Sequence, residues 1–257
     1  MTSLRGASLV VAMVLSIFAC ARAMHAQGPS SASAESVVMS VIDIKPDLTS
    51  EFGALQADAM AAQQAGGQAW RETWHTATFG HPHRVVVLSP VAGLDHFDGQ
   101  SYTAKGVGAV AAASINERAR RMIAHQQIYL LQRRPDLGMG ARPAKSTLGV
   151  VSYIGVAPGR ELEIEQLLKT DVHAALRKAG VGYYGVSRVI YGGDTSQYVT
   201  LLTFENFADL GRGHPLERAL GADGLSKLQG KLTGVVTSLE RHVIRLNEAL
   251  SFGQTPQ

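Results

Sequence analysis

The sequence predicts an α+β fold in which one β-α-β-β-α-β unit occurs twice, with the two sheets packed against each other as a pseudo-dimeric barrel. Three observations predict it: a repeated β-rich segment ending in proline, an amphipathic helix ending in glycine after each copy, and a pair of strands after each helix. Such a unit covers only one face of its sheet with helices. A second copy in the same chain would cover the other face.

The first strand and first helix recur most clearly. Residues 36–46 (Ser-Val-Val-Met-Ser-Val-Ile-Asp-Ile-Lys-Pro) match residues 149–158 (Gly-Val-Val-Ser-Tyr-Ile-Gly-Val-Ala-Pro), and proline ends a strand because it cannot continue a ladder. Apolar residues then recur at helical spacing: Leu48, Phe52, Leu55, Ala59 and Ala62 in the first copy, and Ile164, Leu168, Val172 and Ala175 in the second. Each helix ends in Ala-Gly, where glycine favours a left-handed cap.

Two strands joined by a hairpin follow each helix. Aligned without a gap, residues 69–79 correspond to 183–193, and residues 84–88 to 198–202. The segments between the strands, residues 80–83 and 192–196, are rich in glycine and polar residues and suit hairpin turns.

A second helix and a last strand complete each copy. The predicted helical stripes are Ala111, Ile115, Ala119 and Met122 in the first copy, and Leu225, Leu228, Leu232, Val235 and Leu239 in the second. The predicted last strands are residues 128–132 and 242–246. We expect a signal peptide at 1–26, a disordered leader at 27–35, repeats at 36–134 and 147–250, a linker at 135–146 and a tail at 251–257.

The first residues are typical of a secretory signal. A short basic start precedes an apolar run at residues 7–19 and a small-residue site, so cleavage is expected after Ala23 or Ala26. We therefore expect a periplasmic or secreted protein that is not stably inserted in a membrane after processing. The alternative is a lipoprotein anchored through Cys20.

The composition narrows the classes of partner. Cys20 is the only cysteine, so a chain cut after Ala26 has no disulfide. The formal charge is +3, but the predicted signal carries Arg5 and Arg22 and no acid. Because no basic run remains elsewhere, we expect no nucleic-acid partner.

The order of elements resembles the dimeric α+β barrel superfamily, with the two halves of the dimer fused in tandem. Phrases such as Val-Ile-Tyr-Gly-Gly at residues 189–193 and Phe-Glu-Asn-Phe-Ala-Asp-Leu at residues 204–210 add to the resemblance, which is greatest to exported bacterial proteins of unknown function. The superfamily includes cofactor-independent monooxygenases, haem-dependent enzymes and stress-response proteins, so the resemblance implies a fold and no single activity. An oligomer is compatible with it.

Candidate site residues lie on the strand at residues 69–76. Alternation places Trp70, Glu72 and Trp74 on one face, and Arg71, Thr73 and His75 on the other. If the second face lines the space between the sheets, His75 and Arg71 are candidate catalytic residues, as base and anion-stabilising group. The candidate ligand-binding residues are Trp70, Trp74, Tyr184 and Arg188. The alternative is that the tryptophans pack under helices while Arg71 and His75 lie near a sheet end.

The remaining histidines predict no metal or cofactor. His81 and His83 flank a proline in a turn near His75 and His96, but no acid or thiolate at fixed spacing completes a tetrahedral set, so a solvated turn explains them better. His173, a conceivable haem ligand, is expected to point partly outward, away from the buried helix face.

Three functional hypotheses remain open. The first is a protein that binds a small apolar or aromatic ligand between its sheets. The second is a cofactor-independent monooxygenase of small molecules, and the third is a protein-interaction domain.

Overall fold

The computed structural model describes residues 36–91 and 93–253. The predicted signal peptide with Cys20, the predicted leader and the last four residues of the predicted tail lie outside the described residues. Export and the domain boundaries therefore stay predictions. Within the described ranges, every helix is too short or too polar to cross a bilayer.

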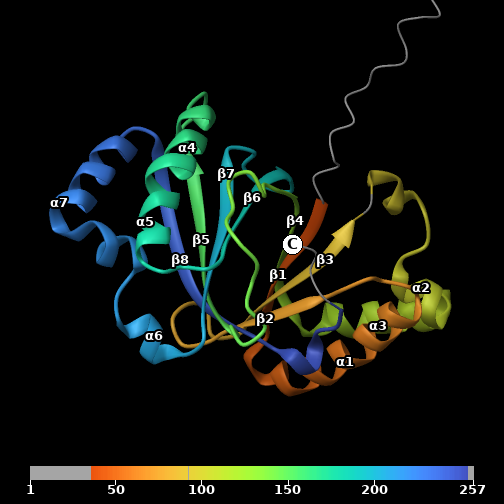
Figure 1. The fold of residues 1–257 in the computed structure, drawn as a ribbon. Helices are drawn as coiled ribbons and strands as arrows, with labels where there is room; N and C mark the ends of the chain where they lie inside the picture. The colour runs from red at the N-terminus through yellow and green to blue at the C-terminus, as the bar shows by residue number, and fades with distance from the viewer. Residues whose placement is uncertain (1–35, 92, 254–257) are drawn as a thin grey trace, which may run out of the picture. The chain divides into compact units, whose positions relative to one another are not determined.

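The strands form a closed antiparallel barrel (Figure 1). Around the barrel their order is β1-β3-β2-β8-β5-β7-β6-β4, and β4 pairs again with β1. The strands are β1 (Ser36–Ile44), β2 (Glu72–Thr76), β3 (Arg84–Val91), β4 (Ile123–Arg133), β5 (Leu148–Val156), β6 (Tyr184–Tyr191), β7 (Gln197–Phe204) and β8 (Val236–Leu246).

Each half of the chain contributes four neighbouring strands. β1 to β4, the first quartet, pair in the order β4-β1-β3-β2, and β5 to β8, the second quartet, in the order β8-β5-β7-β6. Pairing of β2 with β8 and of β4 with β6 joins the quartets. The prediction of a mixed α+β fold built around a sheet-rich barrel is confirmed.

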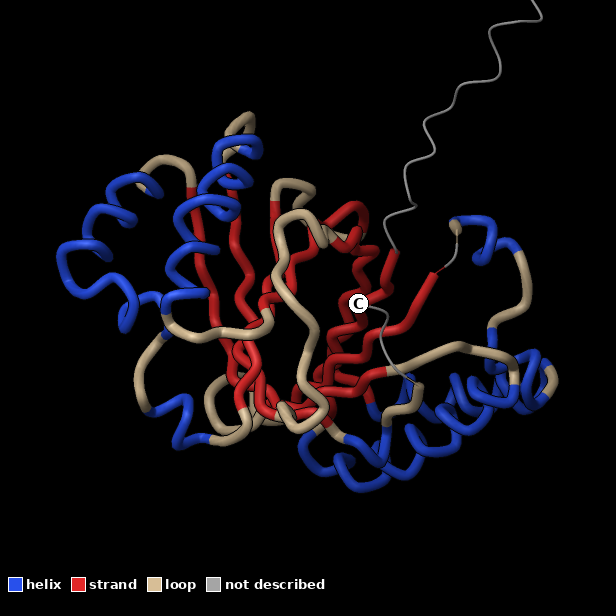
Figure 2. Tube along the Cα trace, in the orientation of Figure 1, coloured by secondary structure: helices blue, strands red, loops and turns tan. Residues whose placement is uncertain are grey.

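The helices lie outside the strands (Figure 2). They are α1 (Thr49–Ala65), α2 (Tyr102–Val107), α3 (Ala109–Met122), α4 (Glu161–Leu167), α5 (His173–Lys178), α6 (Phe207–Gly211) and α7 (Pro215–Leu232). A π-helical turn at Leu168–Val172 joins α4 to α5, and short 3-10 turns lie at Pro46–Leu48, Leu94–Asp98 and Glu248–Leu250.

The end of α7 differs from the predicted leucine stripe. The helix stops at Leu232, and Gly234 adopts a φ of 73° before β8 begins. Val235 and Leu239, which fit a helical spacing, therefore lie in the turn and in β8. The predicted last strands were correspondingly too short, because a helical stripe and a strand pattern overlap at these positions.

Buried apolar side chains form separate clusters on the two sides of the barrel wall. The interior cluster draws on all eight strands, including Met39, Trp74 and Val199. Outside, Phe52 of α1 packs on β1 and β3. A larger outer cluster joins Leu168 and Leu176 to β5–β8.

The ladder pairing corrects the alignment of the two halves by one residue. Leu88 pairs with Met39 and with Glu72, whereas Leu201 pairs with Val151 and with Gly185. Glu72 therefore corresponds to Gly185 and not to Val186. Because the strand period is two, a shift of one residue moves every side chain to the opposite face. The structural counterpart of Arg71 is thus Tyr184, and that of Trp74 is Ser187.

The predicted linker and the C-terminal segment both pack on the barrel. Arg142 of the linker is 2.6 Å from a carboxylate oxygen of Glu72, and Leu137 is fully buried. The residues after β8 bind the start of β2. Phe252 exchanges backbone bonds with Arg71, just before β2, and the Thr73 hydroxyl in β2 donates to the Leu250 carbonyl at 2.7 Å. This C-terminal clasp fixes the second half of the chain to the first.

Candidate functional site

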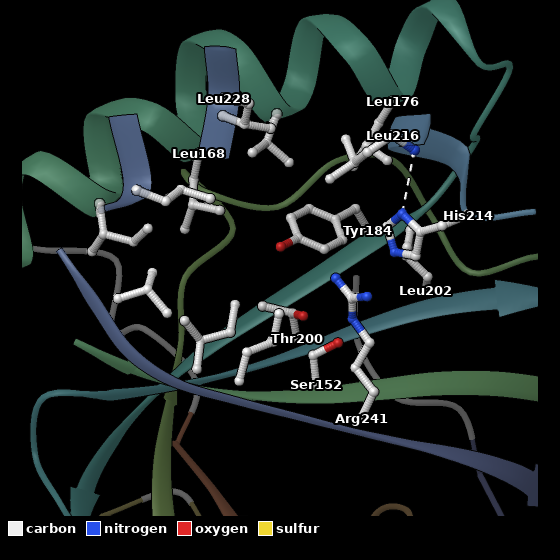
Figure 3. Close-up of a pocket in the computed structure, with 16 residues that line it drawn as sticks. Ser152, Leu168, Leu176, Tyr184, Thr200, Leu202, His214, Leu216, Leu228 and Arg241 are labelled. Atoms are coloured by element: carbon white, nitrogen blue, oxygen red, sulfur yellow. Dashed lines mark hydrogen bonds between the residues drawn. The ribbon is translucent and has the colours of Figure 1, made fainter. Parts of the chain in front are cut away.

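A pocket of about 100 Å³ lies between the second quartet and the helices that cover it (Figure 3). We call it the outer pocket. Its lining residues are Ser152, Ile154, Ile164, Leu168, Val172, Leu176, Tyr184, Thr200, Leu202, His214, Leu216, Leu228, Leu232, Val236, Leu239 and Arg241. Pockets for drug-sized molecules measure roughly 300–1,000 Å³, so this one suits a much smaller molecule.

The apolar wall comes from α4, α5 and α7. Ile164, Leu168, Val172 and Leu176 face the sheet along one continuous helix that contains the π-helical turn. Such turns insert an extra residue and occur frequently at functional sites. Leu228 of α7 closes the wall and is 4% exposed.

Three polar side chains form a row across the floor of the outer pocket. Ser152 on β5 pairs directly with Arg241 on β8 and with Thr200 on β7, so all three point to the same face. Ser152 and Thr200 are 8% and 4% exposed. Among the described residues, the Ser152 hydroxyl makes no hydrogen bond. This hydroxyl is open to the pocket, so a molecule that enters the pocket can bind it.

Tyr184 on β6 places its phenol beside this row (Figure 3). Burial raises the pKa of Tyr184 to about 12, and the Thr200 hydroxyl and the Arg241 charge offset part of the rise. The phenol is therefore neutral near pH 7 and can donate a hydrogen bond.

His214 lies at the start of α7 and faces the same end of the pocket. Its Nδ1 accepts the backbone N–H of Leu216 at 3.3 Å, which caps the helix. Burial, followed by the nearby Arg241 charge, lowers the pKa of His214 to about 4. The neutral imidazole thus carries its proton on Nε2, a tautomer that we assign from this hydrogen bond.

Of the residues predicted from the sequence, only Tyr184 lines the outer pocket. Trp70 and Trp74 lie in the interior cluster, where the Trp74 Nε1 donates to Glu72 at 3.1 Å and the Arg142 guanidinium covers its ring. Arg188 donates from Nε to the carbonyl of Thr195 at 3.0 Å, outside the pocket.

Arg71 and His75 do not face the space between the sheets. The condition set for these two candidates is therefore not met, and the alternative that the tryptophans pack under helices is not met either, because Trp70 and Trp74 point into the barrel. The Arg71 guanidinium donates to Gln56 and Gln63 of α1, and burial lowers its pKa to about 10. His75 lies 3.2 Å from the amide nitrogen of Asn247, and burial lowers its pKa. These contacts place both residues between the barrel, α1 and the C-terminal clasp.

Sequence reasoning missed Ser152, Thr200, His214 and Arg241. One pattern in the sequence does indicate Ser152. In the run Val-Val-Ser-Tyr-Ile at 150–154, it is the polar residue between two apolar residues of the same strand face. Thr200 occupies the paired position on β7. His214 lines the pocket only because of where α7 packs on the barrel, and no local sequence pattern indicates that packing.

No metal or haem ligand set is evident among the described residues. No cluster of three or more His, Cys, Asp or Glu side chains could hold an ion there. His173 is buried, contrary to the expectation that it points partly outward, and its Nε2 lies 2.6 Å from the Leu137 carbonyl. That contact occupies the nitrogen that would ligate a haem iron, so His173 does not fit this role.

Comparisons with known proteins give a fold and no closer relationship. No protein-family model matches the chain, and no curated protein matches it. Solved structures do match. An anthrone oxidase-like protein has a TM-score of 0.58 at 9% identity and covers 84% of this chain and 92% of its own.

Two further structures are named "putative monooxygenase". The protein from Fusobacterium nucleatum has a TM-score of 0.57 at 9% identity, covering 87% of this chain and 99% of its own. The one from Lactobacillus acidophilus has a TM-score of 0.55 at 9% identity, covering 83% and 94%. At such identities the likeness concerns the fold alone. The fold shared with these structures is an α+β barrel, as the sequence predicts.

Proposed function

We propose that the protein binds a small, mainly apolar or aromatic molecule in the outer pocket. The observation that carries the proposal is the Ser152 hydroxyl, which has no hydrogen-bond partner among the described residues and opens onto a leucine-lined cavity. A ligand oxygen would satisfy this hydroxyl, and the leucines would bury the apolar part of the ligand. Pockets that are mostly apolar with a few convergent polar groups are typical ligand sites.

The outer pocket is not the ligand site expected from the sequence, which was the space between the two sheets. The space between the two quartets holds side chains of all eight strands, including both tryptophans. The outer pocket instead lies on the opposite side of the β5–β8 wall. Its volume of about 100 Å³ favours a ligand with one ring or a short branched chain.

The test is mass spectrometry of small molecules released from protein that was purified under native conditions. We expect one predominant small molecule, retained less by Ser152→Val. Ser40→Val is the matched control, because Ser40 occupies the corresponding ladder position in the first quartet, opposite Val87 and Ile128. If nothing is released and ligand-observed NMR finds no binder in a library of small aromatic compounds, the proposal fails.

The second candidate function is a cofactor-independent monooxygenase acting at the same pocket. The names of the structural neighbours favour it. In such a reaction one oxygen atom of O₂ enters the substrate and the other leaves as water, with all electrons supplied by the substrate. Arg71 and His75 lie outside the outer pocket, so they are not placed to act there. His214 would contribute an Nε2–H donor for a developing oxyanion.

Oxygen uptake separates the two functions. A monooxygenase consumes O₂ in stoichiometry with the oxidation of a small phenol or hydroquinone, and His214→Ala lowers that rate. A binding protein retains the same compounds without O₂ uptake above the rate of the buffer.

We also propose that the two quartets with their helices are diverged copies of one ferredoxin-like unit, packed as a pseudo-dimer in an exported protein. The matching strand orders and ladder registers support the duplication. The signal-like first residues support export to the periplasm or the medium. Intact mass of the exported protein tests the second point, because a full-length mass or a lipid on Cys20 would contradict cleavage after Ala23 or Ala26.

A further inference from the structure

The polar groups that face the outer pocket are hydrogen-bond donors, and none is an acid. Hydroxyls come from Ser152, Thr200 and Tyr184, a neutral imidazole from His214 and a guanidinium from Arg241. The lining contains neither aspartate nor glutamate. Hydroxyls can also accept, but a cation and an Nε2–H donor beside them favour a ligand group that only accepts.

Arg241 has no carboxylate partner among the described residues, unlike three arginines elsewhere on the barrel. Arg84, Arg134 and Arg142 each pair with a carboxylate, of Asp43, Glu165 and Glu72 respectively. Arg241 has no ion pair with any residue that the structure describes. Its charge still reaches the pocket, because it lowers the pKa of both His214 and Tyr184. Glu217, which raises the pKa of His214, and Arg218, which lowers it, also act at this end, but neither lines the pocket and Glu217 forms no ion pair with Arg241 among the described residues.

The outer pocket has a polar end, where Arg241 lies, and an apolar end. Arg241, Ser152 and Thr200 are cross-strand neighbours, and Figure 3 shows His214 on their side of the cavity. Leu168 and Leu228 lie toward the other side. Since Arg241 is exposed at the rim, an anionic group bound there keeps contact with water while the apolar body enters the pocket.

Building on the proposed function, we infer that the ligand of the outer pocket is a small monocarboxylic acid whose carboxylate binds Arg241 and the Ser152 hydroxyl. A guanidinium presents paired N–H groups that match the two oxygens of a carboxylate. The hydroxyl at the adjacent strand position supplies a further donor. The apolar body has one ring or a short branched chain, which the cavity of about 100 Å³ accepts.

The experiment compares benzoate with benzamide, which have the same shape and differ in charge. Binding of each to the full processed chain at pH 7 is measured by calorimetry. We expect benzoate to bind roughly tenfold more tightly, as charge-assisted hydrogen bonds exceed neutral ones. Arg241→Gln should abolish the difference while benzamide affinity stays the same. Arg245→Gln, on the same strand and the same face, should keep the difference, because that guanidinium lies over Phe207.

The outcomes separate this inference from the function on which it rests. Equal affinity of the two probes in the unaltered protein, or a benzoate preference that survives Arg241→Gln, overturns the carboxylate assignment and leaves the pocket as a binding site. Absence of binding of both probes, together with no molecule retained on purification, overturns the proposed function itself.

Discussion

The outer faces of the two quartets occupy matching ladder positions but differ in chemistry. Where the second quartet has Arg241, Ser152, Thr200 and Tyr184, the first has Ile128, Ser40, Val87 and Arg71. One face carries a polar row with a free cation at its rim. The other carries apolar residues, with its cation bound to a helix.

The helices that cover the two faces also differ. On the second quartet, α5 contacts α7, and both helices line the outer pocket. In the first half, α3 contacts α1 and α2, and Ile128 at the place of Arg241 remains 51% exposed. Arg71 is buried at the place of Tyr184 and holds α1 through Gln56 and Gln63. The same strand framework therefore supports a pocket in one half and a structural junction in the other.

The largest expected effect comes from separating the halves. Residues 147–257 expressed alone lose the β2–β8 and β4–β6 ladders and expose their part of the interior cluster. Exposed apolar surface of this extent drives association. We expect an aggregated chain or a homodimer by light scattering. A stable soluble monomer would show that the second half folds without the first.

Arg71→Met tests the contact between the first quartet and α1. The side-chain carbonyl oxygens of Gln56 and Gln63 lose the Arg71 guanidinium as their hydrogen-bond donor. Because the site is largely buried, the free energy of unfolding should fall by about 1–3 kcal/mol in urea titrations. Arg188→Met, which removes a guanidinium bound to one loop carbonyl, should change it by less than about 0.5 kcal/mol. Equal effects of the two substitutions would contradict a special role for Arg71.

The pH dependence of stability tests the environment of His214. Its pKa of about 4 in the folded protein lies below the ordinary 6.5, so between these values the unfolded chain binds more protons. Stability should therefore fall as the pH drops from 6.5 to 4, with His214 contributing about 1–2 kcal/mol.

His214→Asn keeps a helix-capping acceptor and should flatten this slope. His75, whose pKa burial also lowers, contributes in both proteins. A His214→Asn protein with an unchanged slope would show that the imidazole is not held neutral by its surroundings.

The smallest expected effect is on stability after Ser152→Val. The Ser152 hydroxyl makes no hydrogen bond and is open to the pocket, so its removal should change the stability of the ligand-free protein by less than about 0.5 kcal/mol. Ser40→Val removes a hydroxyl that accepts from Gln126 at 3.3 Å and should bring no gain. A clear loss of stability in Ser152→Val measured by thermal unfolding would indicate that the hydroxyl has a structural role.

The sequence predicted the barrel because its strongest signals are local and occur twice. Both halves have a proline at the end of the first strand and an Ala-Gly pair at the end of the first helix. The later strands carry no such mark, and the gapless alignment at residues 69–79 was wrong by one residue. That single shift matched the inward tryptophan face of the first half with the outward face of Tyr184 in the second.

The candidate site was less accessible to sequence reasoning. Tyr184 was proposed as a ligand residue, and it lines the outer pocket. Ser152 and Arg241 are distant in sequence and become neighbours only through the register of β5 with β8. His214 caps α7, and the proline at the next position indicates that a helix begins there. The proline does not indicate where α7 packs on the barrel.

Ligand binding at the outer pocket is tested most directly by methyl NMR. Benzoate added to protein with labelled leucine and valine methyls should shift the signals of Leu168, Leu176, Leu228 and Val172. Signals of the interior valines Val86, Val151 and Val199 and of Val87 on the first quartet should stay in place. Shifts that concentrate in the interior set, with the outer-pocket methyls unmoved, would place the ligand between the sheets and contradict the account.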